Sequence, residues 1–317
     1  MSTGTIILIA VSAFAVFNIA FYLFMIVYAS YQVYTQTLKR RSKDQWGRNV
    51  SEYTDYQIKM DEEGMEWYYA NESRKKDVHI VNKGLNLYGE YYDFGSDKSV
   101  IVLSGRTESL RYGYYFAKPY SDSGFNVLVV DPRAHGLSDG VYNTVGFEES
   151  GDALEWARFL EREMGVKTVV FHGICIGAAG GMLGITSPDC PECVKGLVTE
   201  GMFANFSESM KNHLIERKRN WFPIRQCIDF WMKRYTGHSM TKGPIDYIPK
   251  MDKPLLMIQS KMDTYSTPEN AKKLFDACPS EHKSIVWYDK GGHSQLRLTD
   301  TEKYDNAVKE FLNKYFI

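Results

Sequence analysis

The chain has 317 residues, a length that fits one large domain together with a smaller additional segment. Its 38 basic and 39 acidic side chains nearly cancel, and a formal net charge of −1 gives no reason to expect a nucleic-acid partner. The five cysteines are few and odd in number, which argues against a secreted fold held by disulfides and favours a reducing compartment.

The N-terminal segment predicts a membrane anchor at residues 1–30. Residues 5–29 carry no charge and are long enough to cross the roughly 30 Å hydrocarbon core of a bilayer as a helix. Tyrosines follow at interface depth, and the basic cluster at 39–43 places the large domain in the cytoplasm by the positive-inside rule. A cleaved signal peptide is the alternative, but the apolar run is too long and no basic residues precede it.

A polar, tyrosine-rich juxtamembrane connector is expected at residues 31–77, helical around 61–73, and a larger domain at 78–317. The larger domain predicts strands and helices in alternation, which is typical of an α/β fold with a mostly parallel, doubly wound sheet. We expect a hairpin at 78–81 and 85–92, strands at 99–103, 126–131, 168–172, 196–200, 254–259 and 284–288, and helices at 110–123, 144–164, 268–277 and 300–315.

Residues 202–250 interrupt this alternation. The segment is mostly helical in pattern and mixes aromatic residues at 221–222 and 230–231 with many lysines and arginines. We interpret it as a short helical lid inserted over the carboxyl edge of the sheet. Its basic residues either form a solvated face or contact anionic lipid next to the anchor.

Cys175 stands where a hydrolytic enzyme would carry its nucleophile. It follows an apolar, β-branched run, and residues 173–177 read Gly-x-Cys-x-Gly before a run of small residues. This is the strand–turn–helix context of a nucleophile elbow, with sulfur in place of the usual serine hydroxyl. Side chains at Gly173 and Gly177 would collide with the neighbouring strands and helix. A helix N-terminus also favours a thiolate at Cys175.

An acid and a histidine follow at the ends of later strands. Asp263 comes after the strand at 254–259 and His293 after the strand at 284–288, so the order is nucleophile, acid, histidine. His293 would take the thiol proton and pass it to the leaving group, and Asp263 would orient the imidazole. Glu200, at the end of the strand at 196–200, is an alternative acid.

Two backbone N–H groups are needed to stabilise the oxyanion of an acyl-transfer intermediate. Ile176, the residue after the nucleophile, offers one. The turn after the strand at 99–103 offers the other, which we assign to Arg106.

Other conspicuous residues receive structural interpretations. His135 and His172 are expected to be hydrogen-bonded structural histidines. Cys190 and Cys193 invite a zinc or redox interpretation, but no second ligand pair has the spacing for zinc and the motif precedes a strand rather than a helix. We interpret them as unlinked thiols in a turn, and no metal or organic cofactor is predicted.

From about residue 76 to its end the chain resembles the α/β-hydrolase superfamily. The matching stretches are 104–109, 131–140, the elbow, the turn around Asp263 and 291–294. The resemblance is closest to a short-lidded branch that includes membrane-associated acyl-protein thioesterases and monoglyceride and lysophospholipid lipases. Two departures are Cys175, where serine is usual, and Ser104, where histidine is usual. Cysteine also occurs at this position in dienelactone hydrolases and bile-acid acyltransferases.

The resemblance implies a membrane-anchored cytoplasmic hydrolase that cleaves acyl esters or thioesters through Cys175, His293 and Asp263. A small-molecule or lipid-like acyl substrate is expected, without a nucleic-acid partner. Two alternatives stay open, namely an acyltransferase with the same triad and a non-catalytic, membrane-tethered interaction protein.

Overall fold

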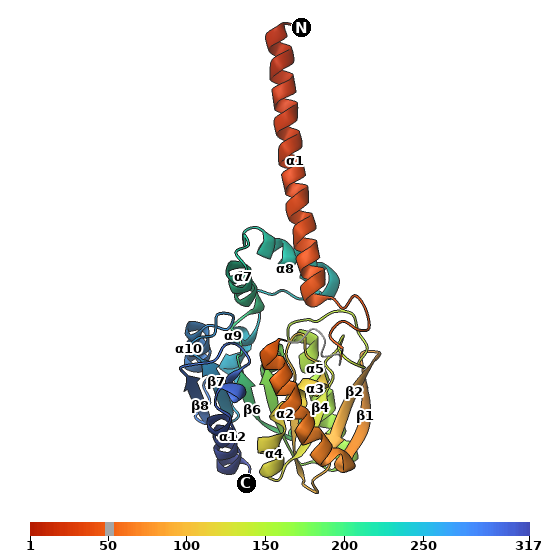
Figure 1. The fold of residues 1–317 in the computed structure, drawn as a ribbon, viewed down its shortest axis with the longest axis vertical. Helices are drawn as coiled ribbons and strands as arrows, with labels where there is room; N and C mark the ends of the chain where they lie inside the picture. Colours follow the sequence, from red (N-terminus) through yellow and green to blue (C-terminus); the bar gives the residue numbers. More distant parts are fainter. Residues whose placement is uncertain (48–53) are drawn as a thin grey trace.

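An eight-stranded sheet organises the chain in the computed structural model, which describes residues 1–47 and 54–317 (Figure 1). Its spatial order is β1-β2-β4-β3-β5-β6-β7-β8. The β1–β2 and β2–β4 pairs are antiparallel and all other pairs are parallel. The strands are β1 Lys75–Asn82, β2 Leu85–Tyr92, β3 Lys98–Leu103, β4 Asn126–Val130, β5 Thr168–Ile174, β6 Val194–Glu200, β7 Leu255–Ser260 and β8 Lys283–Tyr288. The predicted α/β class and mostly parallel sheet are confirmed.

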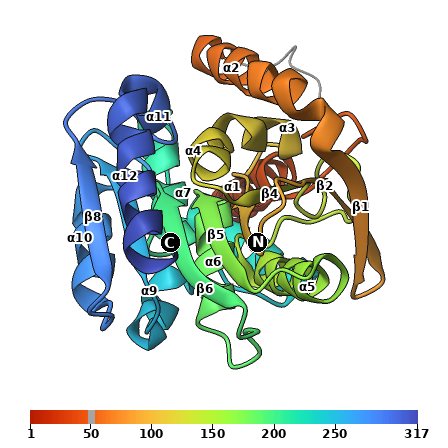
Figure 2. The same cartoon turned by 90° about the horizontal axis from the view of Figure 1, so that it is seen from below.

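Helices cover both faces of the sheet, as expected for strands that are apolar on both sides (Figure 2). On one face, α5 (Phe147–Met164), α6 (Ile176–Ile185) and α10 (Pro268–Ala277) enclose one apolar cluster. On the other face, α2 (Asp55–Asn71) and α12 (Thr301–Tyr315) enclose the second, together with the short helices between β3 and β4.

The structure differs from the predicted elements in two short helical regions. The helix predicted at 110–123 is broken into α3 (Leu110–Gly113), a 3₁₀ turn and α4 (Lys118–Asp122). Pro119 lies in the first turn of α4, where its missing N–H is tolerated, whereas it would break a helix interior. The four-residue α11 (Leu296–Thr299) was not predicted, because so short a helix shows no apolar period.

The N-terminal helix α1 (Thr3–Leu38) is longer than the predicted anchor. Its 36 residues span about 54 Å, and it is long and apolar enough to cross a membrane. The helix does not stop at the predicted boundary near residue 30 but continues into the connector. Its last turns are buried, including Ser30, Tyr34 and Leu38. The connector becomes helical again in α2, which begins at Asp55 rather than near residue 61.

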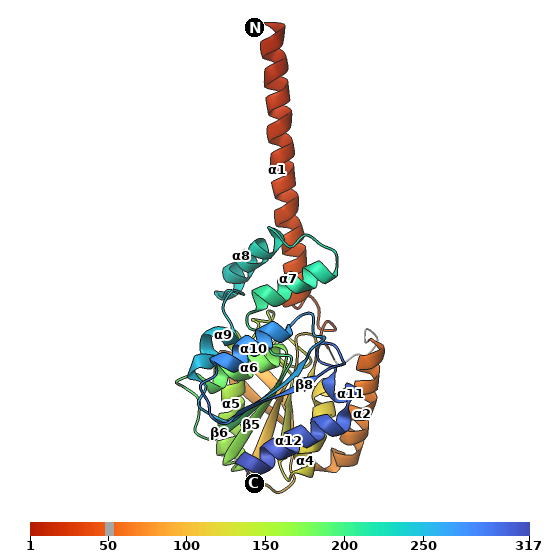
Figure 3. The same cartoon turned by 90° about the vertical axis from the view of Figure 1, so that its left-hand side faces the viewer.

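The predicted lid contains α7 (Phe206–Glu216), α8 (Ile224–Thr236) and the short α9 (Pro244–Tyr247). Helices α7 and α8 lie between the projecting part of α1 and the sheet (Figure 3). The Trp231 indole N–H donates a hydrogen bond to the Ser30 hydroxyl at 3.1 Å, and the Trp231 ring contacts that of Tyr31 edge-on. The lid and the end of α1 therefore form one packed layer.

Candidate active site

The turn between β5 and α6 holds Cys175 in a strained conformation. Its φ is +52°, a value that L residues seldom adopt. A Cβ atom added to Gly173 would lie 2.4 Å from Cα of Ala178, and one added to Gly177 would lie 1.9 Å from the Leu103 carbonyl oxygen. Only glycine lets the helix start this close to β5 and β3, as the sequence pattern predicted.

The predicted acid and histidine meet at the same edge of the sheet. The Nδ1 atom of His293 lies 2.8 Å from Oδ2 of Asp263. The other carboxylate oxygen of Asp263 accepts backbone N–H bonds from Tyr265 and Ser266, each at 2.8 Å. The Asp263 side chain is 1% exposed and that of His293 is 15% exposed, so backbone donors fix the acid while the imidazole reaches solvent.

The His293 ring also interacts with the sulfur of Cys175. Burial disfavours charge on this ring, but the negative charges of Cys175 and Asp263, and hydrogen bonds to both side chains, raise the pKa of His293 well above its usual range. The structure therefore brings a thiol, an imidazole and a carboxylate together from three separate loops. This arrangement has the three groups that nucleophilic catalysis by a thiol requires.

Glu200, the alternative acid, has a different set of contacts. It is fully buried, and its Oε1 atom accepts a hydrogen bond from the Leu296 backbone N–H at 2.9 Å. Burial raises the pKa of the Glu200 carboxyl. Its backbone carbonyl accepts the N–H of Cys175 at 2.9 Å. Glu200 thus supports the elbow and the start of α11, while Asp263 accepts the hydrogen bond of His293.

The two backbone groups assigned to the oxyanion hole are free to donate. Among residues 1–47 and 54–317, neither the Ile176 N–H nor the Arg106 N–H donates a hydrogen bond to another group. Two side chains hold the loop that carries Arg106. Glu108 accepts the Gly105 N–H at 2.8 Å, and Nε2 of His135 lies 2.5 Å from the Arg106 carbonyl oxygen.

A cleft of about 640 Å³ opens above Cys175 and His293. The end of α1, the first turn of α2, the loop after β3 and the lid helix α7 form its walls. The charged and titratable side chains that line it are Tyr56, Arg106, Glu108, Cys175, His213, Glu216, Arg217, Tyr265 and His293. The wall contributed by α7 combines Phe206 and Met210 with polar residues.

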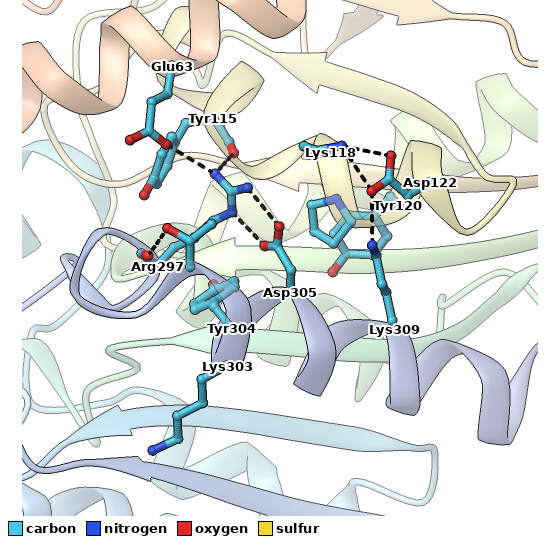
Figure 4. Close-up of polar contacts among 12 residues, drawn as sticks. Glu63, Tyr115, Lys118, Tyr120, Asp122, Arg297, Lys303, Tyr304, Asp305 and Lys309 are labelled. Carbon is cyan, nitrogen blue, oxygen red and sulfur yellow. Dashed lines mark hydrogen bonds and ion pairs between the residues drawn. The ribbon is translucent and has the colours of Figure 1, made fainter.

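One buried network near the site was not predicted (Figure 4). Arg297, in α11, donates to both carboxylate oxygens of Asp305 at 2.7 and 2.9 Å and to the Tyr115 carbonyl oxygen at 2.8 Å. It thereby ties the segment that follows His293 to α12 and to the loop after β3. The pairing joins residues with no motif in common, so the sequence held no signal for it.

The other polar residues have the structural roles that the sequence predicted. His172 is buried with hydroxyl oxygens of Tyr120 and Tyr304 at 2.8 and 3.2 Å from its ring nitrogens. Cys190 and Cys193 are free thiols. No group of three potential metal ligands occurs within the part of the chain that the structure describes.

These features define a known fold class. The chain has the α/β-hydrolase fold, with the elbow after β5 and the acid and histidine after β7 and β8. The esterase Pf2001 of Pyrococcus furiosus superimposes with a TM-score of 0.65 at 23% identity, over 77% of this chain and 92% of that one.

Sequence comparison gives further similar proteins. The uncharacterized protein YqkD of Bacillus subtilis is 26% identical over 219 residues, 68% of this chain and 71% of YqkD. A monoglyceride lipase of Saccharomyces cerevisiae is 32% identical over 99 residues, which is 29% of this chain and 30% of the lipase. No protein-family model matches the chain.

Proposed function

We propose that this protein is a membrane-anchored hydrolase that cleaves acyl esters or thioesters, with Cys175 as the nucleophile, His293 as the general base and acid, and Asp263 as the residue that orients the imidazole. The observation that carries the proposal is the position of the His293 ring. The ring is hydrogen-bonded to the Asp263 carboxylate and also interacts with the Cys175 sulfur. The names of two similar proteins, an esterase and a monoglyceride lipase, agree with ester chemistry.

The reaction follows from these contacts. His293 holds the proton of Cys175, and the thiolate adds to the substrate carbonyl carbon. The carbonyl oxygen becomes an oxyanion, which the N–H groups of Ile176 and Arg106 stabilise. The intermediate expels the alcohol or thiol, to which His293 gives its proton, and a thioester joins the acyl group to Cys175. His293 then takes a proton from water, which attacks the thioester and releases the acid.

The membrane is the proposed place of action. α1 would cross the bilayer, with the basic residues at 39–43 and the larger domain on the cytoplasmic side. The helices α7 and α8 of the lid lie next to the end of α1. Phe222 and Phe230 of the lid have exposed fractions of 63% and 58%. A lipid-like acyl substrate could thus reach the cleft from the membrane surface.

The decisive experiment is intact-mass analysis of the full-length protein after incubation with S-acetyl thioesters. We expect one acetyl adduct that maps to Cys175 and decays with water as the acceptor. Cys175→Ala should carry no adduct, and Cys227→Ala, which removes a thiol of the lid, should behave like the unaltered protein. An unlabelled Cys175 that still reacts with a small alkylating agent would contradict the proposal. Decay only when an amine or alcohol is added would indicate an acyltransferase.

A further inference from the structure

The side chain of Arg106 has no acidic partner in the cleft. Its backbone belongs to the proposed oxyanion hole, but its guanidinium lines the cleft and is half-buried. Its Nη1 group donates a long hydrogen bond, 3.4 Å, to the Thr37 carbonyl oxygen at the end of α1. Within residues 1–47 and 54–317 it forms no ion pair. A partly buried, unpaired charge costs free energy, so its place beside Cys175 calls for a function.

A second guanidinium faces the same space. Arg217, at the end of α7, lines the cleft. Burial is the main cause that lowers the pKa of Arg106, and repulsion by Arg217 lowers it further. Arg217 also lacks an ion pair in the described part of the chain. His213 lies one turn earlier on α7, and burial, with Arg217 and Arg106, lowers its pKa to about 4. At neutral pH it is an uncharged N–H donor.

The acidic residues of the cleft do not neutralise these cations. Glu108 is engaged with the Gly105 N–H, and burial raises the pKa of its carboxyl to about 7. Glu216 shares a hydrogen bond with the hydroxyl of Tyr265. Two arginines and a neutral histidine therefore converge on the space above the nucleophile. The Cys175 sulfur and Glu108 attract Arg106, but neither arginine forms an ion pair with a carboxylate among the described residues.

We propose that the cleft selects acyl esters or thioesters that carry an anionic group, a carboxylate or a phosphate, which Arg106 and Arg217 bind beside the scissile carbonyl. A guanidinium binds either oxyanion through paired N–H groups, a geometry that lysine cannot copy. The selection rests on the proposed function for its substrate class, but the anion site itself can be tested without turnover.

The test uses alkylation of Cys175 by iodoacetate and iodoacetamide, two probes of similar size of which only the first is an anion. Peptide mapping of the full-length protein gives both rates at Cys175 and at Cys227, a thiol outside the cleft. We expect the iodoacetate-to-iodoacetamide ratio to be at least about 10-fold higher at Cys175. Thiolate reactivity affects both probes and cancels in the ratio.

The arginine variants assign the effect. Arg106→Gln should lower the ratio at Cys175 by about 10-fold or more, Arg106→Lys by less because charge remains, and Arg217→Gln by a few-fold because Arg217 is exposed. Arg219→Gln removes an equal charge from the same loop outside the cleft and should leave the ratio unchanged. Equal ratios at Cys175 and Cys227, or an Arg219→Gln effect as large as that of Arg106→Gln, would overturn the proposal.

Two further experiments are needed. The first distinguishes a carboxylate from a phosphate as the bound anion, and the second tests the anion site separately from the proposed hydrolase function. Succinate and inorganic phosphate are compared as protectants of Cys175, and the stronger protectant identifies the oxyanion that the site prefers. S-acetyl-3-mercaptopropionate is then compared with its methyl ester as a substrate. If the anionic thioester and its methyl ester are turned over at equal rates, the proposed anion site is wrong, but the proposed hydrolase function is not affected. If iodoacetate alkylates Cys175 selectively but no thioester acylates it, the proposed hydrolase function is wrong and the proposed anion site is supported.

Discussion

The edge of the sheet and the layer above it are built in different ways. Cys175, Asp263 and His293 come from loops that follow β5, β7 and β8, and hydrogen bonds with backbone groups hold Cys175 and Asp263 in place. The layer formed by α7, α8 and the end of α1 has exposed aromatic and basic side chains on a smaller apolar cluster, which reaches Ile176 and Ala179 of α6. The sheet edge can thus supply one fixed chemistry, while the lid layer determines where and on which molecules it acts.

The largest expected effect tests the chemistry of the sheet edge. Cys175→Ala should lower kcat/KM for a thioester substrate by about 10³-fold or more, because it removes the sulfur that would form the acyl-enzyme. Circular dichroism should match the unaltered protein, since the change removes a single half-buried sulfur atom from the edge of two apolar clusters. Residual activity within 10-fold of the unaltered protein would assign the reaction to another residue.

The next comparison is between the two acids of the sheet edge. Asp263→Asn should lower kcat by about 10²–10⁴-fold, because the amide favours the wrong imidazole tautomer. Glu200→Gln should change kcat only a few-fold, because burial raises the pKa of Glu200 and glutamine can still accept the Leu296 N–H. Steady-state kinetics with one thioester decides between them, and the reverse ranking would make Glu200 the triad acid.

The sequence predicted the sheet edge better than the lid layer. Helix α10 was predicted with its observed bounds, because Thr267 caps it and Pro268 starts it. The positions of Cys175, Asp263 and His293 followed from strand ends, which are local signals. The contact of α1 with the lid and the unpaired charge of Arg106 depend on residues far apart in the chain. No periodicity encodes such contacts, so they required coordinates.

A third comparison sets a buried ion pair beside an exposed one (Figure 4). Arg297→Met should destabilise the protein by about 3–5 kcal/mol, because it leaves the Asp305 carboxylate buried without its partner. Lys309→Met breaks an exposed pair with Asp122 and should cost about 0–1 kcal/mol. Chemical unfolding in detergent measures both. The double variant Arg297→Met, Asp305→Leu should recover part of the loss, and no recovery would contradict a purely electrostatic cause.

Glu108 gives a pH-dependent test of the cleft. Burial raises the pKa of its carboxyl from its ordinary value of 4.5 to about 7. Between these values the folded protein holds a proton that the unfolded chain has released, so this group lowers stability as the pH rises. Glu108→Gln stays neutral and should be more stable than the unaltered protein by roughly 1–3 kcal/mol at pH 8, with little difference at pH 5. Chemical unfolding at both pH values measures this, and lower stability of the variant at pH 8 would show that the charged form is favoured.

The smallest expected effect concerns the outer face of the lid. The loop between α7 and α8 carries Lys218 and Arg219 next to the exposed Phe222. If this loop rests on anionic lipid, trypsin should cleave it a few-fold more slowly in vesicles that contain phosphatidylglycerol than in phosphatidylcholine vesicles.

Because α1 anchors the protein in both kinds of vesicle, the difference in cleavage rate reports on the lid rather than on anchoring. Phe222→Ser should reduce the protection, since it removes an apolar group from the membrane-facing loop. Tyr69→Ser, which alters an equally exposed aromatic residue on α2, should leave it unchanged. Equal cleavage in the two lipids would mean that the basic residues are a solvated face, and the lid would then act on the substrate alone.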